Sequence, residues 1–89
     1  MKSLSIRLSG KVQGVFFRAS DKVVADHLDV KGIVRNEPDG SVYIEAEAHE
    51  KILNQFVDWC KKGPAHAEVM TFVIAQMPEK GYVEFRIVR

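Results

Sequence analysis

Cysteine is nearly absent from this sequence, since Cys60 is the only one among 89 residues. A single cysteine cannot form an intramolecular disulfide, and without a cluster of cysteine and histidine residues the chain offers no zinc site. Long apolar runs are missing as well, so no segment is expected to span a bilayer. The chain also does not open on the pattern of a signal peptide. We therefore expect a protein of the reducing cytosol that does not bind membranes.

An excess of charge of either sign is missing too. Lysine and arginine number 13 against 12 aspartate and glutamate residues, which gives a net charge of +1. Such a balance does not create the strong field with which proteins attract nucleic acid or acidic membranes. The hydrophobic share of 46% and the mean hydropathy of −0.12 are those of an ordinary globular protein. The length predicts a single domain over residues 1–89.

The periodicity of the apolar residues predicts five extended segments and two helices. The extended segments cover residues 3–9, 32–36, 42–48, 69–76 and 83–87, and the helices cover about residues 18–29 and 50–62. Pro38-Asp39-Gly40 supplies the turn of a β-hairpin, and Gly63-Pro64 ends the second helix. The segment 69–76 carries apolar residues on both faces, so the sequence does not decide which of them points to the core.

The resulting order is β-α-β-β-α-β, with the segment 69–76 as a possible additional strand before the last. Two helices then cover the apolar face of one antiparallel sheet and leave the polar face to solvent. This arrangement is an α+β, ferredoxin-like sandwich. We place Cys60 in the core, and the following residues in solvent: Asp21, Lys22, Asp26, His27, Asp29, Glu45, Glu47, His49 and His66.

The segment Gly10–Arg18 links the first strand to the first helix and carries two glycines and a terminal arginine. A strand-to-helix turn of this kind points backbone N–H groups into one concavity at the positive end of the helix. A guanidinium at its rim makes a receptor for a phosphoryl group or a similar oxyanion. Gly14 lets the backbone approach such a group closely. The loop is therefore a candidate active site.

Two motifs give the sequence a resemblance to a known family. The first is Gly10-x-Val12-Gln13-Gly14-Val15-x-Phe17-Arg18, and the second is Gly32-x-Val34-x-Asn36-x-x-Asp39-Gly40-x-Val42. In this order and spacing they resemble the two signatures of the acylphosphatase family, and the helix ending Lys62-Gly63-Pro64 is similar as well. The resemblance covers essentially the whole chain, which looks like a small, stand-alone acylphosphatase.

The resemblance implies hydrolysis of the carboxyl–phosphate bond of acyl phosphates to a carboxylate and inorganic phosphate. It implies that Arg18 binds the phosphoryl oxygens and that Asn36 orients the attacking water. Backbone N–H groups of a phosphate loop would hold the remaining oxygens; this loop comprises Gln13, Gly14, Val15, Phe16, Phe17 and Arg18. No metal or cofactor is implied. We expect a monomer that does not bind nucleic acid, acts on a small-molecule acyl phosphate, and is inhibited by phosphate or sulfate.

The chemistry of the residues agrees with this reaction. A carboxylic acid has a pKa of about 4, so the carboxylate departs without being protonated. The remaining requirement is to neutralise phosphoryl charge and to place a water in line. Arg18 and the loop meet the first need, and the amide of Asn36 meets the second because it accepts a hydrogen bond while neutral. The proton of the water is expected to pass to the phosphate of the substrate.

Other interpretations stay open at this point. Arg18 could form a surface ion pair with Asp21, and Asn36 could be only a turn residue. Ferredoxin-like sheets also bind RNA on the open face through stacked aromatics, although this face offers essentially Tyr43 beside two glutamates. A small-ligand sensing domain shares the topology as well. Nothing obvious in the sequence builds a pocket for a particular acyl group.

Overall fold

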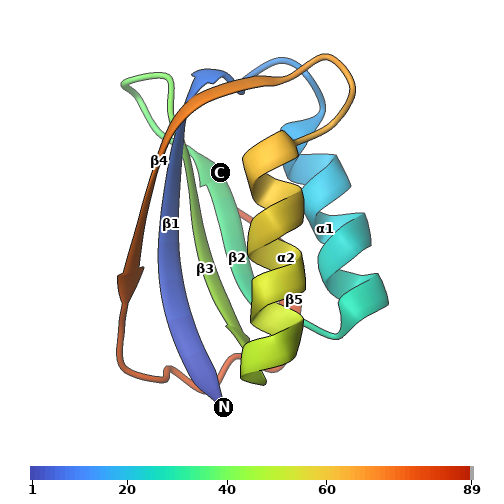
Figure 1. Ribbon diagram of the computed structural model, residues 1–89, viewed down its shortest axis with the longest axis vertical. Helices are drawn as coiled ribbons and strands as arrows, with labels where there is room; N and C mark the ends of the chain where they lie inside the picture. The colour runs from blue at the N-terminus through green and yellow to red at the C-terminus, as the bar shows by residue number, and fades with distance from the viewer. Residues whose placement is uncertain (89) are drawn as a thin grey trace.

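The computed structural model describes residues 1–88 and places two helices on one face of a five-stranded sheet (Figure 1). The elements in chain order are β1 (Lys2–Lys11), α1 (Phe17–Leu28), β2 (Lys31–Asn36), β3 (Val42–Ala48), α2 (Glu50–Lys62), β4 (Glu68–Gln76) and β5 (Phe85–Ile87). All the predicted elements are present. The second arm of the hairpin and the second helix have the predicted bounds. Turn residues mark the start of the arm and the end of the helix.

The strands lie in the order β4-β1-β3-β2-β5. Neighbouring strands are antiparallel except for β5, which runs parallel to β2 and places Ile87 opposite Val34. The predicted ferredoxin-like fold is confirmed, and the parallel pair is the one feature that its description as an antiparallel sheet lacks. β5 begins at Phe85 instead of Val83, because residues 77–84 first cross the open face of the sheet.

The core lies between the sheet and the two helices. Inward residues of β1 and β3 alternate with outward ones, so Ile6, Leu8 and Ile44 are fully buried. The helices contribute their apolar stripes, which consist of Phe17, Ala25, Leu53, Phe56, Val57 and Cys60. Cys60 is buried and all three histidines are exposed, as predicted. Burial of Phe17 fixes the first residue of α1 and therefore the end of the loop that leads into it.

The edge strand β4 shows which of its two apolar faces points inward. Its register places Phe72 opposite Leu8 and Ile74 opposite Ile6, so Phe72 and Ile74 lie on the helix side. Both remain partly exposed, because an edge strand has a neighbour on one side only. The sequence left this orientation open for the same reason, since neither face of β4 is fully buried.

Glu45 and Glu47 of β3 are buried, so the prediction that they are solvated is wrong. They are 6% and 3% exposed, because the segment 77–84 lies over them. The Lys80 N–H donates to Glu47 at 2.5 Å, and the Lys80 ammonium lies 2.9 Å from Glu45. Burial raises the pKa of each carboxyl group, but the hydrogen bonds that each accepts outweigh burial and lower the pKa below its ordinary value.

Asp21 is also buried, although the helical pattern placed it in solvent. Its side chain is 0% exposed; Oδ1 accepts a hydrogen bond from the Cys60 thiol at 3.5 Å, and Oδ2 has no partner within residues 1–88. Burial raises the pKa of Asp21 well above its ordinary value, and the thiol hydrogen bond offsets this only in part. A surface ion pair between Asp21 and Arg18 is therefore excluded.

Replacing Asp21 with asparagine should stabilise the folded protein at neutral pH. The pKa of the Asp21 carboxyl is higher in the folded than in the unfolded chain, so the folded state retains a proton that the unfolded state releases. Stability therefore falls as the pH rises above the unfolded pKa of about 4. We expect Asp21→Asn to gain on the order of 1–3 kcal/mol at pH 7 and much less at pH 4, measured by urea unfolding.

Asp26→Asn is the matched control for this experiment. The exposed Asp26 carboxylate pairs with Lys22 at 2.7 Å, and exposed pairs contribute little to stability. A gain by Asp21→Asn that is equal at the two pH values would contradict a proton held by the buried carboxyl.

Candidate active site

The phosphate loop, residues 13–18, connects β1 to α1 through two residues with positive φ. Gly14 has a φ of 73° and Phe16 a φ of 63°, whereas φ of Val15 between them is not positive. Such alternation turns successive backbone N–H groups toward one side, which creates a concavity suited to an anion. The side chains of Val15 and Phe17 are buried, so they anchor the loop to the core.

The first turn of α1 adds the positive end of a helix to this loop. Phe16 occupies the N-cap position, no side chain caps the helix, and no acidic residue lies in the first turn. The first N–H groups of a helix have no partner within the helix. Without a cap or a carboxylate nearby, these N–H groups and the helix dipole favour binding of an anion.

Asn36 ends β2, and the hairpin turn that follows holds it in position. The Ser41 N–H donates to Asp39 Oδ1 at 2.9 Å, and the Glu37 N–H donates to the Ser41 carbonyl at 2.8 Å. Gly40 completes the turn with a φ of 93°. The buried Oδ1 of Asn36 has no hydrogen-bond partner within residues 1–88. A buried acceptor without a partner is unfavourable and rare.

Arg18 and Asn36 line one pocket, although they come from different elements. Its volume is about 340 Å³, at the small end of the range for ligand sites. Its walls are Val12, Gly14, Phe16, Phe17, Arg18, Ala19, Asn36 and Ile87. None of these described residues is an acid, a histidine or a lysine. The pocket thus presents one guanidinium, one amide and the backbone of the loop.

The side chain of Gln13 joins the phosphate loop to the hairpin that carries Asn36. Its Nε2 donates to the carbonyl oxygens of Glu37 at 2.8 Å and Ser41 at 2.9 Å. The sequence predicts only a backbone role for Gln13. No local pattern marks this clamp, because both acceptors lie more than twenty positions further along the chain. The Gln13 amide therefore links the loop that carries Arg18 to the hairpin that carries Asn36.

Gln13→Met should lower activity by more than its effect on stability explains. Methionine keeps the shape but loses both donated hydrogen bonds, each of which contributes about 0.5–1.5 kcal/mol. The loop and Asn36 then shift relative to each other, and small misplacements reduce rates strongly. We expect kcat/KM to fall about 10-fold or more at a temperature where the variant is fully folded.

Gln55→Met, on the exposed face of α2, is the matched control for the Gln13 variant. It should leave kcat/KM within about twofold, since exposed substitutions away from a site have small effects. If Gln13→Met retained full activity, the clamp would not position the site.

The residues predicted for the site lie together, but not all of them line the pocket. Five of them do, namely Gly14, Phe16, Phe17, Arg18 and Asn36. The Gln13 side chain faces the hairpin and the Val15 side chain the core, so only their backbone N–H groups are available. Three further walls, Val12, Ala19 and Ile87, were not predicted. No sequence feature marks Ile87 as a site residue, because it lies in the last strand, far from either motif.

The fold and the pocket define a class of protein, a small α+β domain with a pocket beside an uncapped helix N-terminus. The family model for acylphosphatase matches residues 4–87. The chain is 43% identical over 89 residues to the acylphosphatase of Ligilactobacillus salivarius, covering 98% of both chains. It is 45% identical over 87 residues to that of Thermotoga petrophila, covering 98% of this chain and 97% of the relative.

A solved structure agrees with these sequence matches. The crystal structure of acylphosphatase from Bacillus subtilis matches this fold with a TM-score of 0.97 at 34% identity, covering 100% of both chains. The chain therefore belongs to the acylphosphatase family. The prediction from the two motifs, an enzyme that hydrolyses acyl phosphates, is confirmed by this membership. Neither helix of the described part of the chain is long and apolar enough to cross a membrane.

Proposed function

We propose that the pocket around Arg18 and Asn36 is the active site and that it hydrolyses acyl phosphates without a covalent intermediate. The main support is that these two side chains and the uncapped start of α1 share one pocket. The phosphoryl group binds to the N–H groups of residues 13–18 and to Arg18. A planar guanidinium donates two parallel hydrogen bonds to phosphoryl oxygens, which a lysine cannot do.

Asn36 places the attacking water in this mechanism. The amide oxygen of Asn36 accepts a hydrogen bond from the water, which directs the oxygen lone pair toward phosphorus. A bond forms between the water oxygen and phosphorus while the bond from phosphorus to the acyl oxygen breaks. The electron pair of that broken bond leaves with the carboxylate.

The protons of this reaction need no side-chain acid or base. The carboxylate leaves unprotonated, since its conjugate acid has a pKa of about 4. The proton of the water passes to a phosphoryl oxygen, because no described residue lining the pocket can accept it at neutral pH. Catalysis then rests on positioning and on stabilisation of phosphoryl charge.

We also expect the enzyme to act as a monomer in the cytosol, inhibited by phosphate or sulfate. Every side chain assigned to the site comes from one chain, so catalysis needs no second copy. Phosphate and sulfate carry the same tetrahedral set of oxygens as the phosphoryl group. Binding of nucleic acid is not expected, because Arg7 and Arg35 already flank Tyr43 on the open face and residues 77–84 cover part of it.

Hydrolysis of benzoyl phosphate, followed by its ultraviolet absorbance, tests the proposed function. We expect turnover far above spontaneous hydrolysis, with competitive inhibition by inorganic phosphate. Turnover at the spontaneous rate would contradict the proposal, and inhibition that is not competitive would show that phosphate binds outside the pocket.

A further inference from the structure

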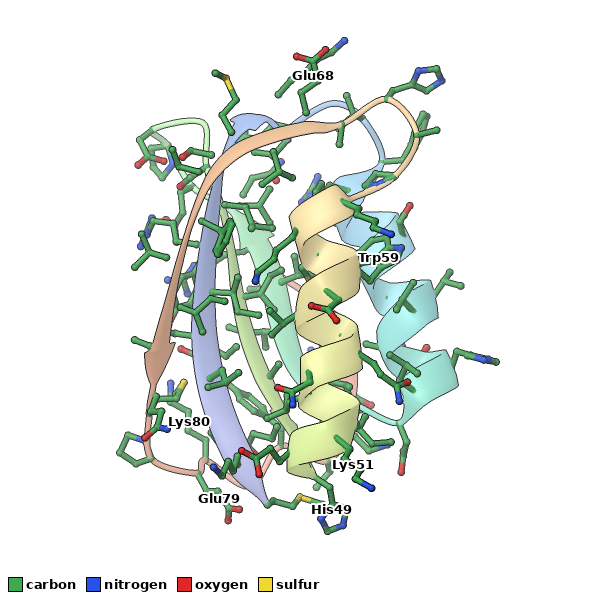
Figure 2. All side chains as sticks on the ribbon, in the orientation of Figure 1. His49, Lys51, Trp59, Glu68, Glu79 and Lys80 are labelled. Carbon is green, nitrogen blue, oxygen red and sulfur yellow. The ribbon has the colours of Figure 1, made fainter. Side chains whose placement is uncertain are left out.

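An apolar groove lies beside the phosphate pocket, between the start of α1 and the end of α2. It encloses about 410 Å³, enough for a small organic group. Its walls are Ala19, Ser20, Val23, Val24, Trp59 and Pro64. Figure 2 shows Trp59 on the side of α2 that faces α1. No charged side chain lines the groove, so it suits an apolar occupant.

The groove adjoins the phosphate pocket. Ala19 lines both of them. Phe17, a wall of the phosphate pocket, packs edge-on against Trp59, with the ring centroids 5.7 Å apart. A ligand whose phosphoryl group lies in the phosphate loop can therefore extend over the first turn of α1 into the groove.

Phe16, which lines the phosphate pocket, supplies an independent observation. Its side chain is 78% exposed, and its backbone has a φ of 63°. A bulky residue in this left-handed conformation is strained, and such strain in a native protein is concentrated at functional sites. An exposed aromatic ring gains little for folding, so the position of Phe16 against the phosphate pocket indicates contact with a ligand.

We propose that the groove binds the acyl group of the substrate and that the substrate class is acyl phosphates with an aryl or medium-length alkyl group. This inference rests on the proposed function, since the phosphoryl group sets where the acyl group begins. From Ala19 the groove follows α1 to Val23, about 6 Å further along the helix axis. An acetyl group ends near Ala19, whereas a chain of six carbons reaches Val23.

The occupant is a small tethered group and not a protein partner. The groove joins the anion-binding pocket, and an acyl phosphate carries an anionic end and an apolar end in the same order as these two sites. Val23 is 68% exposed, so contact with an acyl chain removes apolar surface from water. Each buried methylene contributes about 0.8 kcal/mol, which is about fourfold in affinity.

The test compares acetyl phosphate with hexanoyl phosphate. Their leaving groups are chemically alike, so a difference in kcat/KM reports the acyl contacts. We expect the unmodified enzyme to prefer hexanoyl phosphate by about 10-fold or more. Val23→Gln should reduce this preference about threefold or more. Val83→Gln is the matched control, since Val83 is 84% exposed and belongs to the segment on the opposite face of the sheet, and should leave the preference unchanged.

The outcomes separate this inference from the proposed function. If the enzyme hydrolyses neither compound, the proposed function fails. If it hydrolyses both with equal kcat/KM, or if Val23→Gln keeps the full preference, the acyl groove is refuted and the proposed function stands. If Val23→Gln instead dissociates a dimer on size-exclusion chromatography, the groove is a contact between copies and the proposal is overturned.

Discussion

Arg18→Ala is expected to lower kcat/KM for benzoyl phosphate by about 10³-fold or more. Removal of one charge-stabilising donor from a preorganised site typically reduces rates by about 10² to 10³, and removal of an arginine from phosphoryl transfer by about 10³ to 10⁵. Arg18 is the only cationic side chain that lines the described part of the pocket. Arg18→Lys should lower kcat/KM almost as much, because an ammonium cannot contact two oxygens in one plane.

The Arg18 variants should still fold. Arg18 is half-buried, and the structure shows no ion pair between it and residues 1–88, so its removal leaves no buried charge behind. Circular dichroism and the unfolding midpoint should stay close to those of the unmodified protein. Arg86→Ala is the matched control, since Arg86 pairs with Glu84 at 3.3 Å on exposed surface. Near-normal turnover by either Arg18 variant would show that the site assignment is wrong.

Asn36→Ala is expected to separate catalysis from phosphate binding. In the proposed mechanism Asn36 contacts the water and the phosphate loop holds the phosphoryl group, so the variant should lose about 10² to 10³ in kcat. The inhibition constant of inorganic phosphate should change by less than about threefold, because the N–H groups and Arg18 remain. Steady-state kinetics with phosphate as competitor measures both quantities in one experiment.

Two further variants help to interpret the result for Asn36→Ala. Asn54→Ala, on the exposed face of α2, should behave as the unmodified enzyme. Asn36→Asp adds a negative charge to the pocket and should weaken phosphate binding as well as turnover. If Asn36→Ala weakened phosphate binding as much as turnover, Asn36 would be a phosphate ligand and the water would be placed by another group.

Local features account for what could be predicted from the sequence. Pro38-Asp39-Gly40 marks the start of the hairpin arm 42–48, and Gly63-Pro64 marks the end of the helix 50–62. Arg18 and Asn36 were selected by motifs that span the ends of β1 and β2, where the fold brings loops to one edge of the sheet. Their shared pocket follows from the topology of the predicted fold and needs no knowledge of side-chain packing.

The features that were missed depend on segments distant in sequence. Glu45 and Glu47 alternate like solvated residues, and only the crossing of residues 77–84 buries them. Asp21 follows the helical pattern of an exposed position but packs against Cys60 of the other helix. The Gln13 clamp depends on how closely the hairpin approaches the loop. Periodicity reports the environment within one element and carries no information on these partners.

The acyl groove was missed for a related reason. No sequence pattern indicates this groove, because the residues that line it, among them Ala19, Val23, Trp59 and Pro64, come from two helices and a turn. The left-handed Phe16 was equally invisible, since a phenylalanine does not ordinarily adopt a positive φ. The groove forms only where α1 and α2 lie next to each other, as Figure 1 shows.

A crystal structure of the enzyme with bound inorganic phosphate tests the central claim most directly. We predict phosphate inside the pocket, with its oxygens within hydrogen-bond distance of N–H groups in residues 13–18 and of both terminal nitrogens of Arg18. Asn36 should lie beside the phosphate and close enough to hold a water against phosphorus. Phosphate bound only elsewhere, for example at Lys61 and Lys62 at the end of α2, would contradict the account.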